Sequence, residues 1–283
     1  MVRRPSPGLA FLLLFTSCCV ADGFSQKPAD GFDQKKAEGS LYEQAGGASY
    51  IAIIIDDLGY NYSLGLQAAK LPAPLTYSIL PYSTHASRLA DVVHNAGKEV
   101  MIHLPMENLG DNPMGPGGLT NALSRAEFEH TILRAVSNVP HAQGINNHMG
   151  SALTQERRPM EWLMKEIRDL NFFFVDSRTT PKTIASAVAR RNNLLTSSRD
   201  IFLDNDTSVY DIDVQFRKLI RVAKRKGTAI AIGHPHPETL AYLELAIPQL
   251  ADEGIKIIPA SNLVALRKII NPQPRGQDFA EAE

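Results

Sequence analysis

The feature that most constrains this chain is a regular alternation of strand-like and helix-like segments between residues 48 and 271. Each strand-like run is short and mostly apolar, and the stretches between the runs carry apolar residues at helical spacing. Seven or eight such units in one chain favour a parallel barrel over an open sheet. We therefore expect an α/β fold, a (β/α) barrel distorted to seven or eight strands. The runs expected to form its strands are YIAIIID, LTYSIL, EVMIHL, GINNH, NFFFVD, IFLDN, TAIAIGH and IKIIPA.

Local signals mark the ends of several expected helices. Ser124 and Glu127 have the spacing of a capping box, in which two free backbone N–H groups are satisfied reciprocally. Pro181 is suited to the first turn of another helix. Gly97 and Gly227 each follow a helical stretch and precede a strand, as C-terminal caps do. These signals agree with helices that alternate with parallel strands.

The first 21 residues have the pattern of a secretory signal peptide. Arg3 and Arg4 precede an apolar stretch, residues 9–15, which is shorter than the roughly 20 residues that span a bilayer. We expect cleavage after Ala21 and export to the periplasm, with no transmembrane span. The alternative is a lipoprotein signal, in which Cys18 carries the lipid anchor. Because both cysteines of the chain lie in this segment, we expect no disulfide in the exported domain.

Polar segments flank the expected barrel domain, residues 48–271. In residues 22–47 the stretch ADGFSQK recurs as ADGFDQK, so we expect a flexible linker there. Residues 272–283 are similarly polar and are expected to be a disordered tail. The formal net charge of the chain is −1 and no long basic stripe crosses it, which argues against a nucleic-acid partner.

Histidine and carboxylate side chains follow most of the expected strands. In a (β/α) barrel the carboxyl ends of the strands meet at one mouth, so we expect these side chains to converge. Imidazole and carboxylate ligands from several strands suit Zn²⁺ or a similar divalent metal. Such an ion lowers the pKa of bound water and polarises a carbonyl, so the predicted chemistry is metal-assisted hydrolysis. The side chains concerned are Asp56, Asp57, His103, Glu107, His148, Asp176, Asp204 and His234.

Several motifs together resemble those of the divergent polysaccharide deacetylases, the YibQ-like group, which is related to NodB-type carbohydrate esterases. They are IIIDDLGYN, EVMIHLPME, NNHMGS, FFVDSRT, FLDND and AIGHPHPET, and they span nearly all of residues 48–271. The resemblance implies a deacetylase-like barrel with a divalent metal, zinc being the expected ion. It implies that Asp56 is the catalytic base and that Asp57 and His103 bind the metal. It also implies that His234 protonates the departing amine.

One position departs from the NodB-type pattern, which has a second histidine ligand four residues after the first. That position is Glu107 in this chain. We expect His148 to replace the missing ligand, because NNHMGS is an unusually polar end for a strand; Glu107 could instead bind the metal or the substrate. No arginine motif stands where a group supporting the base is expected. The residues that we assign to substrate binding are Glu107, Asn147, Asp176, Arg178 and Asp204.

These expectations combine into one predicted function and two alternatives. The prediction is an exported metal-dependent hydrolase of amide bonds in an envelope polysaccharide, a peptidoglycan-type glycan for example, with N-deacetylase-like activity. The first alternative is a catalytically degenerate envelope module that binds a glycan or a protein partner, which Glu107 in place of a histidine favours. The second is a metal-free glycoside hydrolase that uses the carboxylates of Asp56 and Asp57.

Overall fold

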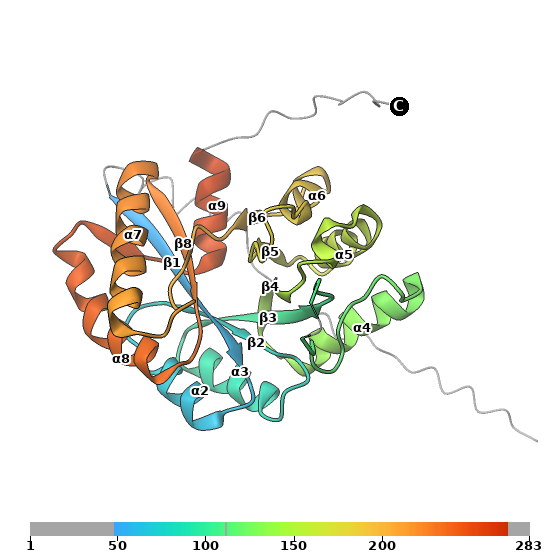
Figure 1. Cartoon of the computed structure of the whole chain (residues 1–283), viewed down its shortest axis with the longest axis horizontal. Helices are drawn as coiled ribbons and strands as arrows, with labels where there is room; N and C mark the ends of the chain where they lie inside the picture. The colour runs from blue at the N-terminus through green and yellow to red at the C-terminus, as the bar shows by residue number, and fades with distance from the viewer. Residues whose placement is uncertain (1–47, 111, 271–283) are drawn as a thin grey trace, which may run out of the picture.

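The computed structural model describes residues 48–110 and 112–270. Within these residues one parallel sheet curls around itself, and helices cover its outer face (Figure 1). The strands are β1 (Ser49–Leu58), β2 (Thr76–Ile79), β3 (Glu99–Met106), β4 (Ala142–Met149), β5 (Phe173–Asp176), β6 (Thr196–Ser198), β7 (Ile201–Phe202), β8 (Thr228–Gly233) and β9 (Ile255–Ile257). The helices are α2 (Tyr62–Ala69), α3 (Ala86–Asn95), α4 (Arg125–Asn138), α5 (Arg157–Asp169), α6 (Ala185–Arg191), α7 (Val209–Lys226), α8 (Pro237–Ala246) and α9 (Ala260–Ile270), with 3₁₀ turns η1 (Leu153–Gln155) and η2 (Ile247–Ala251).

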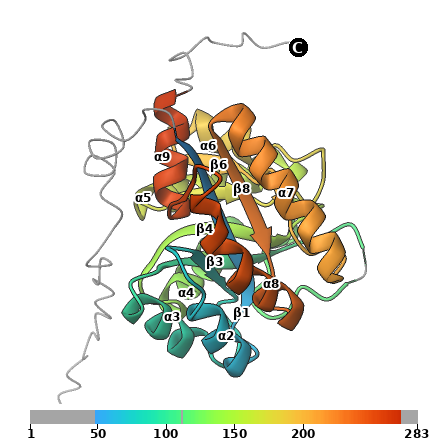
Figure 2. The same ribbon diagram turned by 90° about the vertical axis from the view of Figure 1, so that its left-hand side faces the viewer.

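The strand order is β6-β5-β4-β3-β2-β1-β8-β7, and β9 pairs with the beginning of β1. The expected fold class, a distorted α/β barrel of parallel strands, is confirmed. Among the described residues β6 pairs with β5 and β7 with β8, and no pairing joins β6 to β7, so the curled sheet is a half-barrel with an open seam at the two-residue link between them. Figure 2 shows α9 beside β6 and β8. The described sheet has nine strands rather than seven or eight. The strand that sequence reasoning missed is β6, whose sequence TSS is short and polar.

Side chains of β1 alternate between two apolar clusters, as the period of a strand requires. One set faces the inside of the curled sheet, where it packs with residues of α9 such as Leu263 and Val264; its members are Tyr50, Ala52 and Ile54. The other set packs against the outer helices; its members are Ile51, Ile53 and Ile55. Because both faces are covered, the strand is a continuous apolar run, as parallel strands usually are.

Helix α9 closes the end of the sheet at which the strands begin. The backbone N–H of Ala260 donates to Thr76 Oγ1 at 2.9 Å, and the N–H of Ser261 donates to the buried carboxylate of Glu99 at 3.2 Å. Arg267 lies across the open seam, where Nη1 donates to Ser197 Oγ at 2.7 Å and Nε to Thr228 Oγ1 at 3.0 Å. The interior is therefore filled at this end by α9 and its contacts with the strands.

The signals for helix ends are confirmed at most positions. The capping box of Ser124 and Glu127 opens α4, and Gly227 ends α7 in the left-handed conformation with φ 79°. The prediction for Pro181 is wrong, because α6 begins at Ala185 after a turn.

The predicted signal peptide (1–21), Cys18, the linker (22–47) and the tail (272–283) lie outside the described residues. None of the helices in the part of the chain that the structure describes combines the length and apolar character needed to cross a membrane.

Candidate metal centre

A β-bulge brings Asp56 and Asp57 to the same site. Asp56 continues the inward-facing series of β1, so a regular strand would point Asp57 outward. Instead, the pairing of β1 with β2 shifts between Ile55 and Leu58, and Asp57 adopts a left-handed backbone with φ 56°. An extra residue in one strand re-aims the side chains around it. The bulge thus turns the side chain of Asp57 toward the inward face that Asp56 occupies.

Three donor atoms form a nearly equilateral triangle at the mouth of the sheet. Asp57 Oδ1 lies 3.1 Å from His103 Nε2 and 3.0 Å from His148 Nδ1, and the two nitrogens lie 3.1 Å apart. The histidines come from neighbouring strands, in which Pro105 of β3 pairs with His148 of β4. The structure therefore brings together the three residues that the sequence predicts as metal ligands.

The triangle has the properties of a cation site. Asp57 Oδ1 is buried without a hydrogen-bond donor, although it faces two imidazole nitrogens. An ion about 2.1 Å from each of three ligands separates them by about 3.0–3.4 Å, which matches the observed spacing. Carboxylate and imidazole together suit zinc or a similar divalent ion. The residues present thus fit a metal, and Asp57, His103 and His148 would hold it.

The electrostatics of the site also favour a cation. Burial would raise the pKa of Asp57, but its contacts with His103 and His148 hold that pKa well below the usual range. Burial would lower the pKa of His103, but the charges of Asp56 and Asp57 raise it. Two adjacent carboxylates therefore require a positive charge, which a proton on His103 or a metal ion can supply.

Asn146 connects the ligand His103 to the carboxylate of Asp56. Its Oδ1 accepts from His103 Nδ1 at 2.7 Å and from Ser78 Oγ at 2.6 Å, while its Nδ2 donates to both oxygens of Asp56 at 2.8 and 3.0 Å. Because Nδ1 of His103 donates to this amide, the lone pair of its Nε2 is free to face the triangle. Asn146 and His148 are two residues apart in β4 and so share its inward face.

Asp56 is a buried carboxylate beside the triangle and not a member of it. Its Oδ2 lies 3.6 Å from His103 Nε2, and the residue is 2 % exposed. Burial raises the pKa of Asp56, and the positive charges of His103 and His234 oppose that shift only in part. A carboxylate with a raised pKa is a better proton acceptor than one at its ordinary value.

His234 follows β8, which neighbours β1 on the side away from β4 and its residue His148. Its Nε2 is 4.0 Å from Asp57 Oδ2, and its Nδ1 is held by Asp204 Oδ1 at 2.9 Å. Burial would lower the pKa of His234, but the hydrogen bond and charge of Asp204 raise it to about 9. His234 is therefore protonated at neutral pH and can donate a proton. Asp204, predicted to bind substrate, instead positions His234 and also accepts from the N–H of that residue and from Thr239 Oγ1.

The structure places four other predicted residues outside the triangle. Glu107 Oε2 accepts from Asn121 N at 2.7 Å, so Glu107 fastens a loop and does not join the ligands. Asn147 is buried, and its amide donates to the backbone oxygen of Met149 and accepts from Ser177 N, so it joins two backbone segments beneath the surface. Asp176 is likewise buried; its oxygens accept from Arg178 N and Thr183 Oγ1. Arg178 is exposed and lies beyond the residues that line the adjacent cavity.

Sequence reasoning missed two polar residues at the site. Asn146 could have been found from its spacing of two from His148 in NNHM, which puts both on one face of a strand. Arg199 stacks on the ring of Phe202, with its guanidinium carbon 3.5 Å from the ring centroid, and Phe202 in turn stacks on His234. Burial and the charge of Arg178 lower the pKa of Arg199 to about 10. No spacing rule points to an arginine placed by a turn between short strands.

A curled parallel sheet with histidine and aspartate side chains gathered at the carboxyl ends of its strands defines a (β/α) fold of the polysaccharide-deacetylase type. Residues 53–264 match the family described as divergent polysaccharide deacetylase, and the chain belongs to that family. It is 40% identical to the uncharacterized protein YibQ of Escherichia coli over 217 residues, which cover 77% of this chain and 68% of YibQ. It is 34% identical to an uncharacterized protein of Haemophilus influenzae, with 80% of each chain covered.

Solved structures show the same fold. An uncharacterized protein of Agrobacterium tumefaciens superposes with a TM-score of 0.74 at 22% identity, covering 78% of this chain and 94% of that one. A mutant of a CE4 family pseudoenzyme with restored enzymatic activity has a TM-score of 0.50 at 16% identity, covering 77% of this chain and 68% of that one. A deacetylase solved with substrate also has a TM-score of 0.50, at 14% identity, covering 78% of this chain and 93% of that one.

Proposed function

We propose that this protein is an exported, metal-dependent hydrolase that cleaves amide bonds in an envelope glycan, as a polysaccharide N-deacetylase does. The observation that carries the proposal is the triangle of Asp57, His103 and His148, with His234 held beside it by Asp204. Membership of the divergent polysaccharide deacetylases supports the glycan substrate. The fold shared with a deacetylase solved with substrate is consistent with the same class of reaction.

The metal and the protein divide the chemistry between them. Asp57, His103 and His148 would hold a divalent ion, which would supply Lewis acidity and lower the pKa of a water molecule. Asp56 is placed to accept a proton from the attacking water, and Asn146 holds its carboxylate in position. Addition of the water oxygen to the carbonyl carbon is followed by cleavage of the C–N bond.

His234 completes the reaction on the leaving side. The amine nitrogen needs a proton when the C–N bond breaks, and a histidine with a pKa of about 9 carries one at neutral pH. Asp204 holds Nδ1 of His234, which leaves Nε2 directed toward the site at 4.0 Å from Asp57. The products are a carboxylate and a free amine on the glycan.

The non-catalytic alternative drew its support from Glu107 in the place of a histidine ligand. His148 lies where a third donor is needed, and Glu107 is engaged with the backbone N–H of Asn121. This arrangement weakens the argument for degeneracy, because the substitution does not empty the set of donor atoms. The glycoside hydrolase alternative loses support as well, since the carboxylate of Asp57 faces two imidazoles and does not stand free as a second catalytic carboxylate.

Metal content and activity test the proposal together. We expect the purified protein to contain one zinc ion or a similar divalent ion, by inductively coupled plasma mass spectrometry. His103→Ala and His148→Ala should lose it, while the matched Glu107→Ala variant should keep it. Asp56→Asn should keep the metal and lose hydrolysis of N-acetylated glycan oligomers. A wild-type protein that binds no divalent ion, or that hydrolyses the oligomers equally well without one, would refute the proposal. Fractionation of cells would test the proposed export.

A further inference from the structure

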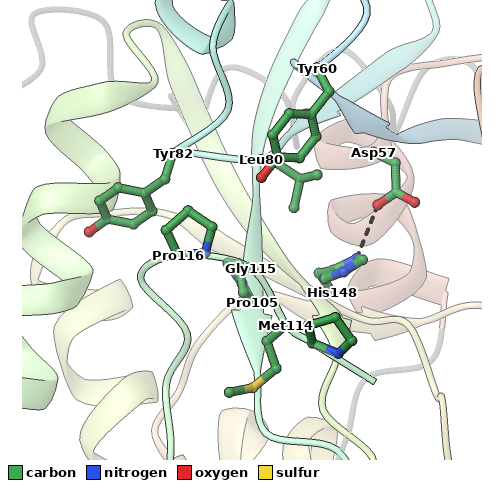
Figure 3. Close-up of a pocket in the computed structure, with 10 residues that line it drawn as sticks. Asp57, Tyr60, Leu80, Tyr82, Pro105, Met114, Gly115, Pro116 and His148 are labelled. Atoms are coloured by element: carbon green, nitrogen blue, oxygen red, sulfur yellow. Dashed lines mark ion pairs between the residues drawn. The ribbon is translucent and has the colours of Figure 1, made fainter. Parts of the chain in front are cut away.

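A cavity of about 270 Å³ opens directly beside the metal triangle (Figure 3). Asp57 and His148 form one side of it, and Tyr60, Leu80 and Met114 are among the residues of the other sides. No residue that lines the cavity comes from β8, the strand that leads to His234. The cavity therefore lies on the side of the two ligands that is away from His234.

The position of the cavity relative to His234 indicates which part of an amide substrate, the amine or the acyl group, would enter it. The amine that leaves must reach His234, which donates its proton. The acyl group is bonded to the other side of the carbonyl carbon and so points away from the amine. With the carbonyl at Asp57 and His148, the acyl group is directed into the cavity.

Asp57, Tyr60 and His148 contribute the polar surface of the cavity, and the rest of its wall is apolar enough to receive an acyl chain. Leu80, Pro105, Met114 and Pro116 contribute apolar surface. The hydroxyl of Tyr82 is engaged, because it donates to the backbone oxygen of Thr131 at 3.3 Å. A sugar ring brings several hydroxyl groups that need hydrogen-bond partners when they leave water, whereas an acyl chain brings none.

The volume exceeds what an acetyl group needs. A methyl group is about as large as one water molecule, whose share of the liquid is about 30 Å³. A cavity of about 270 Å³ that opens to solvent is several times larger than one such group. An acetyl group would leave most of the space to water.

The loop that forms the outer wall of the cavity is held in place by close packing and by hydrogen bonds. A Cβ atom on Gly117 would lie 1.9 Å from the ring of Tyr82, so the loop packs on this ring as closely as glycine allows. The loop is anchored by hydrogen bonds between the backbones of Leu119 and Pro105, at 2.9 Å, and of Glu107 and Leu119, also at 2.9 Å. The side chain of Glu107 bonds the next turn, at Asn121 N. The residue that replaces a histidine ligand therefore holds the wall of the cavity.

We propose that this cavity is an acyl-binding site, and that the protein removes N-linked acyl groups of about four to eight carbons in preference to acetyl. The proposal rests on the proposed function for its reaction, in which water cleaves the amide into a carboxylic acid and an amine. Binding of an unbranched acyl chain beside Asp57 and His148 is a separate part of the proposal, because it does not depend on the reaction.

Binding and turnover test the two claims separately. Spectra of the protein with ¹³C-labelled methionine methyl groups report on the cavity through Met114, whose signal is assigned with Met114→Leu. We expect hexanoate and octanoate to shift this signal at concentrations at least tenfold lower than acetate, because each buried CH₂ is worth about fourfold in affinity. For N-acyl glucosamine oligomers, kcat/KM should rise at least tenfold from acetyl to hexanoyl.

A variant in which a larger side chain fills the cavity tests whether the acyl chain binds there. Met114→Trp should reduce the ratio of kcat/KM for hexanoyl over acetyl at least tenfold. Leu109→Trp lies in the same loop, and Leu109 is 73% exposed, outside the cavity, so this control should leave the ratio unchanged. If Met114 responds to hexanoate while no amide is hydrolysed, the acyl site stands and the proposed function fails. If acetyl is the best substrate and Met114 responds to no acid, or responds to N-acetylglucosamine instead, the acyl site is refuted while the proposed function remains.

Discussion

Replacing Asn146 by leucine removes the group that joins His103, Ser78 and Asp56, with almost no change in side-chain size. In the native structure the amide accepts from His103 and Ser78 and donates to both oxygens of Asp56. Asn146 is 0 % exposed, and Ser78 is too, so water cannot replace the lost partners. The substitution therefore leaves two buried donors without an acceptor and deprives the carboxylate of Asp56 of both hydrogen bonds from this amide.

The expected loss can be estimated from these contacts. A hydrogen bond to a buried carboxylate is worth about 2 kcal/mol, and each buried donor left without a partner costs at least about 1 kcal/mol. We expect Asn146→Leu to lower the free energy of unfolding by about 4 kcal/mol. That is a large share of the roughly 5–15 kcal/mol that stabilises an ordinary domain.

Urea unfolding at neutral pH in the presence of a chelator measures this loss without any contribution from a metal. Ser78→Ala serves as the comparison, since it removes one donor only and should cost about 1 kcal/mol. The loss for Asn146→Leu should also shrink at acidic pH, where Asp56, whose pKa is raised, becomes neutral. A loss below about 1 kcal/mol, or one that does not depend on pH, would refute the view that this amide stabilises a buried charge.

The remaining predictions concern charge and backbone shape. Asp56→Asn should unfold at higher urea than the native chain at neutral pH, with a gain that disappears below the ordinary pKa of aspartate, since burial raises the pKa of Asp56 in the folded state only. Asp204→Asn should lower the pKa of His234 from about 9 toward 6.5, measured by NMR titration, and an unchanged pKa would contradict the role of the carboxylate. Gly97→Ala should lower the free energy of unfolding by about 1 kcal/mol, because φ is 70° there and nothing lies near the added methyl group. Gly117→Ala should lower it by about 1–3 kcal/mol more, because φ is 71° and the methyl group would lie 1.9 Å from the ring of Tyr82. Equal losses in urea unfolding for the two glycines would show that the loop yields easily.

Sequence reasoning predicted the fold well because the strands are apolar on both faces. The runs around β1 and β8 could only be buried strands, and the alternation with helices fixed the parallel arrangement. The open seam could not be predicted, since β6 and β7 are three and two residues long and carry no hydrophobic period. The half-barrel depends on which distant segments pair with one another, and the local sequence pattern of each strand does not determine this.

How well the site residues could be predicted depends on local backbone geometry, which residue types alone do not determine. Asp57, His103 and His148 were predicted from strand ends and family resemblance, and the structure places their donor atoms within 3.1 Å of one another. The bulge that turns Asp57 inward has no signature in IIIDDLG beyond the adjacent glycine. Asn147 was chosen over Asn146, a one-residue error that exchanges the two faces of a strand.

The seam has a consequence for the behaviour of the folded protein in a crowded compartment. A sheet that does not close leaves two edge strands, and unpaired backbone groups on an edge can recruit a strand from another molecule and start aggregation. Here both edges are too short to offer a foreign strand more than a few partners. Arg267 further occupies the backbone oxygen of Ser198 at the end of β6 and pairs with Asp200 in the link between β6 and β7. A charged side chain thus protects the gap against intermolecular pairing, which allows the sheet to stay open.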